Sequence, residues 1–210
     1  MTNAAARYFH ASNLLSYLSL LSGFLAIVFA YEYSNLSVAG GLIAFCSLAD
    51  LLDGKFAALF SRREDQEAFG IQLDSLTDAT VFGLAPVICM GLNLPMTNLS
   101  ARLIWFGAAF FYLLCAITRL GAYNIRSDGG GGFIGLPTTI AGLLCSSIFL
   151  AGPSTLVSIL LLLGCGIAMI SPIPIARPGR LGMVAITCWA TLLMIAHGSR
   201  IYRATAVLNQ

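Results

Sequence analysis

Long stretches without a charged residue are the feature of this sequence that most limits its possible folds. Six runs contain no Asp, Glu, Lys or Arg: 11–31, 33–49, 79–101, 103–118, 129–176 and 181–199. A membrane-spanning helix needs about 20 predominantly apolar residues, and the longest of these runs has room for two. The runs are continuously apolar and do not alternate, which argues against a transmembrane β-barrel. The sequence therefore predicts an all-α fold, a polytopic membrane helical bundle.

We expect seven membrane helices, separated by residues that disfavour regular structure. Their predicted ranges are about 13–31, 37–60, 71–93, 101–125, 137–152, 154–172 and 181–199. Glycines at 129–132 and the proline-rich link 171–180 mark two of the breaks, because glycine is conformationally permissive and proline cannot continue a helix. Residues 1–210 are expected to form one membrane-embedded domain. Residues 1–12 could form an interfacial helix, with Ser12 or Asn13 capping the first span.

The arginines are unevenly distributed between the connections, which indicates an orientation. The N-terminus and alternate connections contain Arg7, Arg62, Arg63, Arg126, Arg177 and Arg180, whereas 32–36, 93–100 and 151–154 contain no basic residue. Basic connections favour the cytoplasmic side, so we expect a multi-pass protein of the cytoplasmic membrane with the basic connections in the cytoplasm. Seven spans would place Arg200 and Arg203 outside. Either the last segment is re-entrant or the count is off by one.

Composition weakens several other interpretations. The net charge is only +2 and no large basic cluster is present, so a nucleic-acid partner is not expected. The six cysteines lie singly among apolar residues without C-x-x-C spacing, which favours membrane packing over metal binding or disulfides. His10 and His197 have no placed partner and are weak candidates for acid–base chemistry.

Four aspartates interrupt the apolar pattern at regular intervals. Asp50 and Asp53 lie three residues apart near the end of the second predicted span, and Asp74 and Asp78 lie four apart near the start of the third. Residues at these spacings share one helix face. The connection 61–69 is short, so the two spans should be antiparallel neighbours. We therefore expect the two acidic faces to meet just inside one membrane boundary.

Such a cluster needs a physical reason to exist at membrane depth. Isolated carboxylates are costly there, and four together repel one another and take up protons. Divalent cations remove both objections, and the hard ions Mg²⁺ and Mn²⁺ prefer oxygen ligands. Two metal ions held by shared carboxylates are a common arrangement for phosphoryl transfer. A proton or cation pathway in a transporter, or ordinary solvation at helix ends, are the alternatives.

Residues 50–78 resemble the signature of the CDP-alcohol phosphotransferase family. That signature reads D-x-x-D-G-x-x-A-R-(x)8-G-x-x-x-D-x-x-x-D, and the chain matches it at Asp50, Asp53, Gly54, Ala57, Gly70, Asp74 and Asp78. Two departures are evident. Ala58 stands where the family has arginine, and eleven residues separate it from Gly70 instead of eight. Lys55, Arg62 or Arg63 could supply the missing positive charge; without it, the chain would be a catalytically weakened homologue.

The resemblance implies a six-helix core, with one or more extra membrane segments here, and a defined site. Asp50, Asp53, Asp74 and Asp78 would hold two divalent ions, Mg²⁺ or Mn²⁺, and Asp78 would be the catalytic general base. The implied nucleotide-binding residues are Asp50, Asp53, Gly54, Ala57, Gly70 and Asp74. An alcohol would attack the β-phosphorus of a CDP-linked lipid and release CMP. A homodimer embedded among membrane lipids is also expected.

Other segments resemble the membrane-integral phosphatidylserine synthases of this family. They are SNLLSYLSLLSGFLAI (12–27), VFGLAP (81–86), RLGAYNI (119–125) and FIGLPTTIAG (133–142). The resemblance implies transfer of a phosphatidyl group from CDP-diacylglycerol, or an analogous CDP-lipid, to L-serine. Inositol phosphate, glycerol phosphate and choline are the alternative acceptors.

Three residues are candidates for binding the acceptor or a phosphate: Arg119, Asn124 and Arg126. Arginine binds carboxylate and phosphate groups bidentately, so Arg119 could hold the carboxylate of serine or a phosphate of the donor. It could also simply extend toward lipid headgroups. Thr138 and Thr139 could cap the fifth span or face the site, and capping is the favoured prediction.

Overall fold

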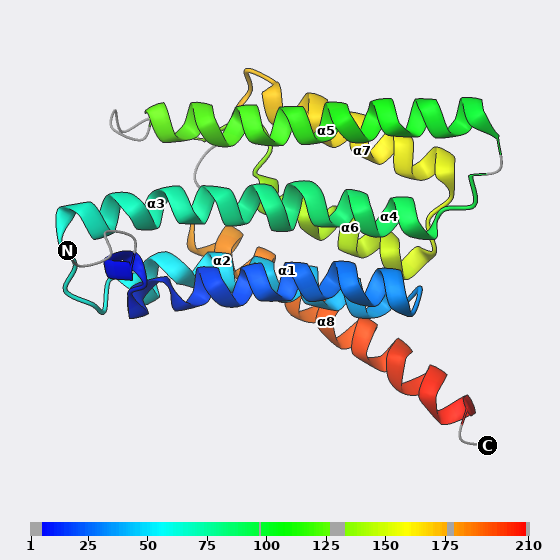
Figure 1. Cartoon of the computed structure of the whole chain (residues 1–210), viewed down its shortest axis with the longest axis horizontal. Coiled ribbons are helices and arrows are strands. Elements are labelled where there is room, and N and C mark those ends of the chain that lie inside the picture. Colours follow the sequence, from blue (N-terminus) through cyan, green and yellow to red (C-terminus); the bar gives the residue numbers. More distant parts are fainter. Residues whose placement is uncertain (1–5, 97, 127–132, 176–178, 209–210) are drawn as a thin grey trace.

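The computed structural model describes residues 6–96, 98–126, 133–175 and 179–208, which form an antiparallel bundle of helices (Figure 1). The helices are α1 (Leu14–Glu32), α2 (Leu36–Ala57), α3 (Glu64–Asp78), α4 (Ala85–Asn93), α5 (Leu99–Arg126), α6 (Thr138–Ala151), α7 (Thr155–Ile170) and α8 (Arg180–Leu208). A π-helical segment, Ala79–Leu84, joins α3 to α4 without a break. The described chain therefore crosses the bundle seven times, and the all-α prediction with seven helices is confirmed.

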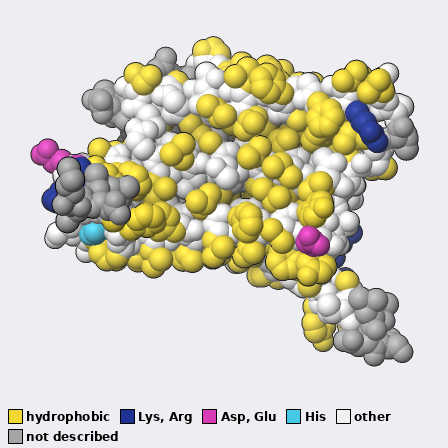
Figure 2. All heavy atoms as spheres, viewed as in Figure 1, with side chains coloured by type: hydrophobic (Ala, Val, Ile, Leu, Met, Phe, Trp, Pro, Cys, Tyr) yellow, Lys and Arg dark blue, Asp and Glu magenta, His cyan; other side chains and the backbone are white. Residues whose placement is uncertain are grey.

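Five of these crossings are long and apolar enough to span a membrane. They are Ala11–Glu32, Leu36–Ala57, Glu64–Asn93, Leu99–Ile125 and Arg180–Ala206. Helices α6 and α7 have 14 and 16 residues, about 21 and 24 Å at the helical rise of 1.5 Å per residue. Figure 2 shows hydrophobic side chains along the visible face, with charged side chains toward its two ends. The chain is a polytopic membrane protein.

Packing within the bundle follows the order of the chain only in part. Helix α2 packs against α1, α6 and α8, while α5 packs against α7. Two residues from each of two distant connections, β1 (Phe133–Ile134) and β2 (Pro174–Ile175), pair antiparallel. This small pairing joins the connection before α6 to the connection before α8.

The start of α3 is earlier than the sequence suggested. The third span was expected from about residue 71, but α3 begins at Glu64. Glu64, Asp65 and Glu67 occupy its first turn, where negative charge favours the N-terminal end of the helix dipole. The backbone N–H of Arg63 also donates to Gln66 Oε1 at 3.1 Å. These polar residues therefore start the helix instead of forming a loop.

The chain before α1 differs from the predicted cap. Residues 6–13 form two 3₁₀ turns, Ala6–Tyr8 and Ala11–Asn13; the first five residues of the possible interfacial helix lie outside the described part. Asn13 precedes α1 but makes no side-chain capping hydrogen bond. Its Nδ2 instead donates to the carbonyl of Tyr8 at 3.3 Å. Of the two predicted caps, Ser12 or Asn13, Asn13 takes the N-cap position, but its side chain does not cap the helix.

The last helix is one continuous segment. Helix α8 is uninterrupted from Arg180 to Leu208, which disfavours a re-entrant segment and leaves Arg200 and Arg203 as exceptions to the distribution of the other arginines. Figure 1 shows the two termini at opposite ends of the bundle, with α8 diverging from the other helices toward its end. Arg200 and Arg203 therefore lie far from the end at which α3 begins.

The π-helical segment has a local cause. Pro86 has no N–H, so it cannot donate to the carbonyl of Phe82, four residues earlier. The hydroxyl of Tyr112 in α5 donates to that carbonyl at 2.6 Å, and both side chains are fully buried. This contact satisfies a backbone acceptor in the core and holds α5 against the segment that directly follows Asp78.

The buried histidine, His197, contributes to packing between helices. His197 of α8 is fully buried, and its Nε2 lies 3.2 Å from Ser146 Oγ. Gly40 of α2 faces the ring so closely that any Cβ there would overlap it. Along α2, Gly40 lies ten residues before Asp50, about 15 Å away at the helical rise. His197 therefore packs α8 onto α2 and lies away from the aspartates.

Candidate active site

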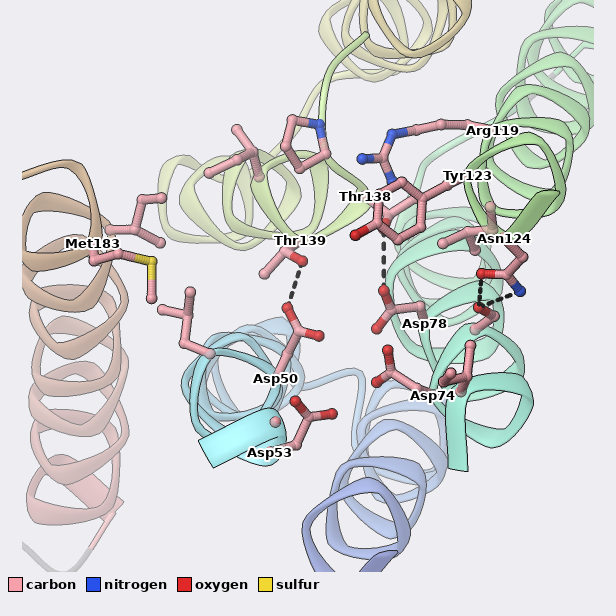
Figure 3. A pocket seen from close by; sticks show the side chains of 18 of the residues that line it. Asp50, Asp53, Asp74, Asp78, Arg119, Tyr123, Asn124, Thr138, Thr139 and Met183 are labelled. Carbon is pink, nitrogen blue, oxygen red and sulfur yellow. Dashed lines mark hydrogen bonds between the residues drawn. The ribbon is translucent and has the colours of Figure 1, made fainter. Parts of the chain in front are cut away.

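Helices α2 and α3 bring three carboxylates together. Asp50, Asp74 and Asp78 each offer an oxygen, and these oxygens all lie within 4.8 Å of one another. The predicted meeting of the two acidic faces is thus confirmed for these three. Asp53 lines the same cavity but lies outside this group. Figure 3 shows its carboxylate facing the same space, one turn along α2 from Asp50.

The first turn of α6 contacts the aspartates directly. Thr139 Oγ1 donates to Asp50 Oδ2 at 2.7 Å, and Thr138 Oγ1 donates to Asp78 Oδ2 at 3.3 Å. Pro137 occupies the N-cap position and makes no side-chain cap hydrogen bond. The preference for capping by the two threonines is wrong, because α6 starts beside the acidic cluster and its hydroxyls find charged acceptors there. Each bond fixes one carboxylate oxygen and leaves the other free to bind a cation.

A cavity of about 700 Å³ extends from this cluster between α2, α3, α5, α6 and α8. Its two sides differ in character (Figure 3). Arg119, Tyr123 and Asn124 line it on the α5 side, next to Asp78. Met183 of α8 lies on the opposite side, and Leu51, Ile140 and Ile186 add further apolar side chains to the lining. A molecule with a charged head and an apolar tail fits such a space.

Arg119 is the buried cation of this cavity. Arg119 is 8% exposed, and its Nε has no hydrogen-bond partner among the described residues. Figure 3 shows the guanidinium reaching toward Thr138 at the start of α6. A buried guanidinium with an unused donor is costly unless a ligand or a carboxylate satisfies it. Of the interpretations of Arg119, extension toward lipid headgroups is therefore disfavoured by its burial.

The other two predicted acceptor residues lie on the last turns of α5. Asn124 lines the cavity and is hydrogen-bonded to Ser75 of α3, with its Nδ2 donating to Ser75 Oγ at 2.9 Å. Ser75 was not predicted, because nothing in its spacing marks it as facing α5. Arg126 ends α5, but its side chain lies outside the described part of the structure.

The donor set of the cluster fits divalent cations. Four carboxylates line the large cavity, against two basic side chains, Arg119 and Lys55, among its described lining residues. This excess of negative charge in a membrane-embedded site requires protons or cations. The converging ligand atoms are all carboxylate oxygens, which hard divalent ions prefer. Three residues of the predicted metal-binding set are thus placed for one shared ion, and Asp53 is adjacent.

A second cavity of about 180 Å³ adjoins the first and shares Asp53, Gly54, Ile71 and Asp74 with it. Ala57 and Gly70 also line this cavity, so five of the six predicted nucleotide-binding residues surround one space; Asp50 lines only the larger one. A Cβ at Gly54 would meet no atom within 4 Å, which leaves its surroundings open to a ligand. Sequence reasoning missed the contribution of the chain before α1, from which Ser12, Asn13 and Ser16 line this cavity.

Comparison with known proteins agrees with this geometry. The sequence profile of the CDP-alcohol phosphatidyltransferase family matches residues 9–209. Archaetidylserine synthase of Methanothermobacter thermautotrophicus is 33% identical over 171 residues, which are 81% of this chain and 71% of that protein.

Two mycobacterial proteins are also similar, and both are named CDP-diacylglycerol–serine O-phosphatidyltransferase. The protein of Mycobacterium tuberculosis is 32% identical over 116 residues, which are 55% of this chain and 38% of the relative. The protein of Mycobacterium leprae is 30% identical over 178 residues, covering 78% of this chain and 57% of the relative. The chain therefore spans about half, or less, of the length of these mycobacterial relatives.

Proposed function

The chain belongs to the CDP-alcohol phosphatidyltransferase family, and from this premise we propose that it transfers a phosphatidyl group from CDP-diacylglycerol, or an analogous CDP-lipid, to the hydroxyl of L-serine. CMP is the second product. The observation that carries the proposal is the convergence of Asp50, Asp74 and Asp78 in the larger cavity, which the smaller one adjoins at Asp74. The names of two relatives, archaetidylserine synthase and CDP-diacylglycerol–serine O-phosphatidyltransferase, support L-serine as the acceptor.

Members of this family use a divalent metal, and the aspartates of this chain fit that use. Asp50, Asp53, Asp74 and Asp78 would hold two such ions, Mg²⁺ or Mn²⁺. When bound, the ions supply positive charge that neutralises the diphosphate and stabilises the leaving CMP. Thr138 and Thr139 orient two of the carboxylates through the hydrogen bonds described above.

The donor lies across both cavities in this proposal. Its cytidine enters the smaller cavity, where Gly54, Ala57 and Gly70 present little or no side chain. Its diphosphate then reaches the aspartates. Its acyl chains leave along the apolar side of the larger cavity, past Met183 and Ile186 of α8, toward the bilayer. The amphiphilic donor thus accounts for a charged site at the edge of a membrane bundle.

The acceptor lies on the α5 side. Serine has a carboxylate, and the buried Arg119 can hold it with two parallel hydrogen bonds. Asn124 adds a polar group on the same wall, and Arg126 is a third candidate at the end of α5. A phosphorylated acceptor would bring two negative charges and would require a denser basic pocket than Arg119 and Lys55 provide.

The reaction is a displacement at the β-phosphorus. The serine hydroxyl oxygen forms a bond to that phosphorus, and the bond to the bridging oxygen breaks, so that CMP leaves with the electron pair. Asp78 accepts the hydroxyl proton as general base.

The distribution of arginines favours the cytoplasmic face of the cytoplasmic membrane for this site. A homodimer is a further expectation that follows from the family.

A screen of acceptor alcohols tests the function. Purified protein would be incubated with CDP-diacylglycerol, Mn²⁺ and one alcohol at a time, and CMP would be measured. We expect CMP with L-serine, together with phosphatidylserine, and little or none with inositol phosphate, glycerol phosphate or choline. Ion flux into vesicles without metal and without CMP formation would instead support the transporter.

A further inference from the structure

The connection between α2 and α3 holds an arginine that is partly buried without an evident structural reason. After α2 ends, the backbone turns through hydrogen bonds from Leu59 N–H to the Phe56 carbonyl and from Phe60 N–H to the Ala57 carbonyl. Arg62 follows, and its side chain is only 19% exposed. The side chain of the neighbouring Arg63 is 63% exposed. A loop arginine normally keeps its guanidinium in water.

Arg62 covers the smaller cavity. It lines that cavity together with Gly54, Ala57 and Gly70, and its Nη1 lies 3.6 Å from the position that a Cβ on Gly70 would occupy. The guanidinium therefore lies within van der Waals range of α3 at Gly70. Its acidic neighbour is Glu67, with Nη2 to Oε1 at 3.9 Å. A contact that long to a mostly exposed carboxylate adds little stability and does not explain why Arg62 is partly buried.

Arg63 and Lys55, the other two residues that could replace the arginine of the family signature, do not line the smaller cavity. Arg63 directs its Nε toward Asp65 at 3.3 Å, on the exposed side of the connection. Lys55 is exposed and lines the larger cavity, not the smaller one. Among the described residues, Arg62 is therefore the one basic side chain that lines the space next to Gly54, Ala57 and Gly70.

We propose that Arg62 is a nucleotide-binding residue that donates hydrogen bonds to the CMP half of the CDP-lipid. The proposal rests on the proposed function of the site. A guanidinium carries only donors, and CMP offers acceptors on its phosphate and on the cytosine ring. Arg62 lies in the connection between the end of α2 at Ala57 and the start of α3 at Glu64, which places it at the cavity. Arg62 thus replaces, from the loop, the positive charge that the family signature places at position 58.

Nucleotide affinity tests this assignment, with Arg62→Ala compared to the matched control Arg63→Ala. Both variants lose one positive charge from the same connection, but Arg63 points away from the cavity. We expect Arg62→Ala to raise the KM for CDP-diacylglycerol and the inhibition constant of CMP by about tenfold or more, as for a lost hydrogen bond between charged groups. Arg63→Ala should stay within about twofold, since exposed charges contribute little. The KM for serine should change in neither.

Binding measured without turnover separates the possible contacts. Titration of Mn²⁺-loaded protein with CMP and with cytidine should show weaker CMP binding for Arg62→Ala. Equal cytidine binding would place the contact on the phosphate, and weaker cytidine binding would place it on the base. Unchanged CMP affinity in a variant that melts at the wild-type temperature would overturn the assignment. Failure of the wild type to release CMP with any alcohol would contradict the proposed function itself.

Discussion

The hydroxyl of Thr139 donates to Oδ2 of Asp50 at 2.7 Å, which joins the first turn of α6 to the end of α2 across 89 residues of sequence. The bond is partly buried, and with an ionised carboxylate as its acceptor it belongs to the stronger class of protein hydrogen bonds. It fixes one oxygen of Asp50 and turns the other toward Asp74 and Asp78 (Figure 3). The position of α6 therefore determines the geometry of the acidic cluster.

Replacing Thr139 tests this role. Thr139→Val keeps the shape of the side chain but removes the hydrogen-bond donor. We expect this loss to weaken metal binding by about 1.5–3 kcal/mol. The concentration of Mn²⁺ that gives half-maximal activity should rise about 10- to 100-fold. Thr139→Ser retains the hydroxyl and is the matched control. If the valine variant needs no more Mn²⁺ than the serine variant, Thr139 does not orient Asp50.

Asp78 should be required for chemistry more than for binding. Asp78→Asn removes the base, and we expect kcat to fall by about 10²–10⁴-fold. The inhibition constant of CMP should rise much less, because Asp50, Asp53 and Asp74 remain. Asp65→Asn is the control, since the ion pairs of Asp65 with Arg7 and Arg63 are exposed and its loss should leave kcat unchanged. An Asp78→Asn variant with near-normal kcat would rule out Asp78 as the general base.

Arg119 should determine affinity for the acceptor. Arg119→Lys keeps the charge but cannot bind a carboxylate bidentately, so we expect the KM for serine to rise about tenfold or more. The KM for CDP-diacylglycerol should stay near its wild-type value. Steady-state kinetics with each substrate varied in turn distinguish the alternatives. A rise confined to the donor would assign Arg119 to a donor phosphate instead.

The prediction for Tyr112 concerns the stability of the fold and not substrate binding. Tyr112→Phe leaves the buried carbonyl of Phe82 without its 2.6 Å donor, which typically costs about 1–3 kcal/mol. The melting temperature in detergent should fall, while the KM values for both substrates should be maintained. Tyr202→Phe is a suitable control, because Tyr202 is 74% exposed near the end of α8. Equal melting temperatures for the two variants would show that the Tyr112 hydroxyl does not stabilise the π-helical segment.

The fold was largely predictable because membrane helices appear in the amino-acid sequence as long uncharged runs. Uncharged runs located all seven crossings, and errors appeared where charge and helix coincide, as at Glu64, which starts α3 although it looks like part of a loop. The π-helical segment could not be predicted. Pro86 removes a donor from the ladder, but the compensating hydroxyl of Tyr112 comes from a distant helix.

The site was predictable within each helix and less so between helices. Spacing placed Asp50 with Asp53 and Asp74 with Asp78, because three and four residues return to the same face. Spacing could not reveal that Asp53 lies outside the close group, since that depends on how α2 is rotated against α3. The threonines of α6 were misassigned for a related reason, because local sequence shows a helix start but not which neighbour it meets.

Manganese binding by the purified chain tests the central claim most directly. Mn²⁺ titration followed by electron paramagnetic resonance, without substrate turnover, counts the bound ions. We expect two ions per chain in the wild type, and loss of tight binding in Asp50→Asn and Asp74→Asn but not in the surface variant Asp65→Asn. A wild-type chain that binds no Mn²⁺, or variants that bind it as tightly as the wild type, would contradict the assignment of these aspartates to a shared metal site.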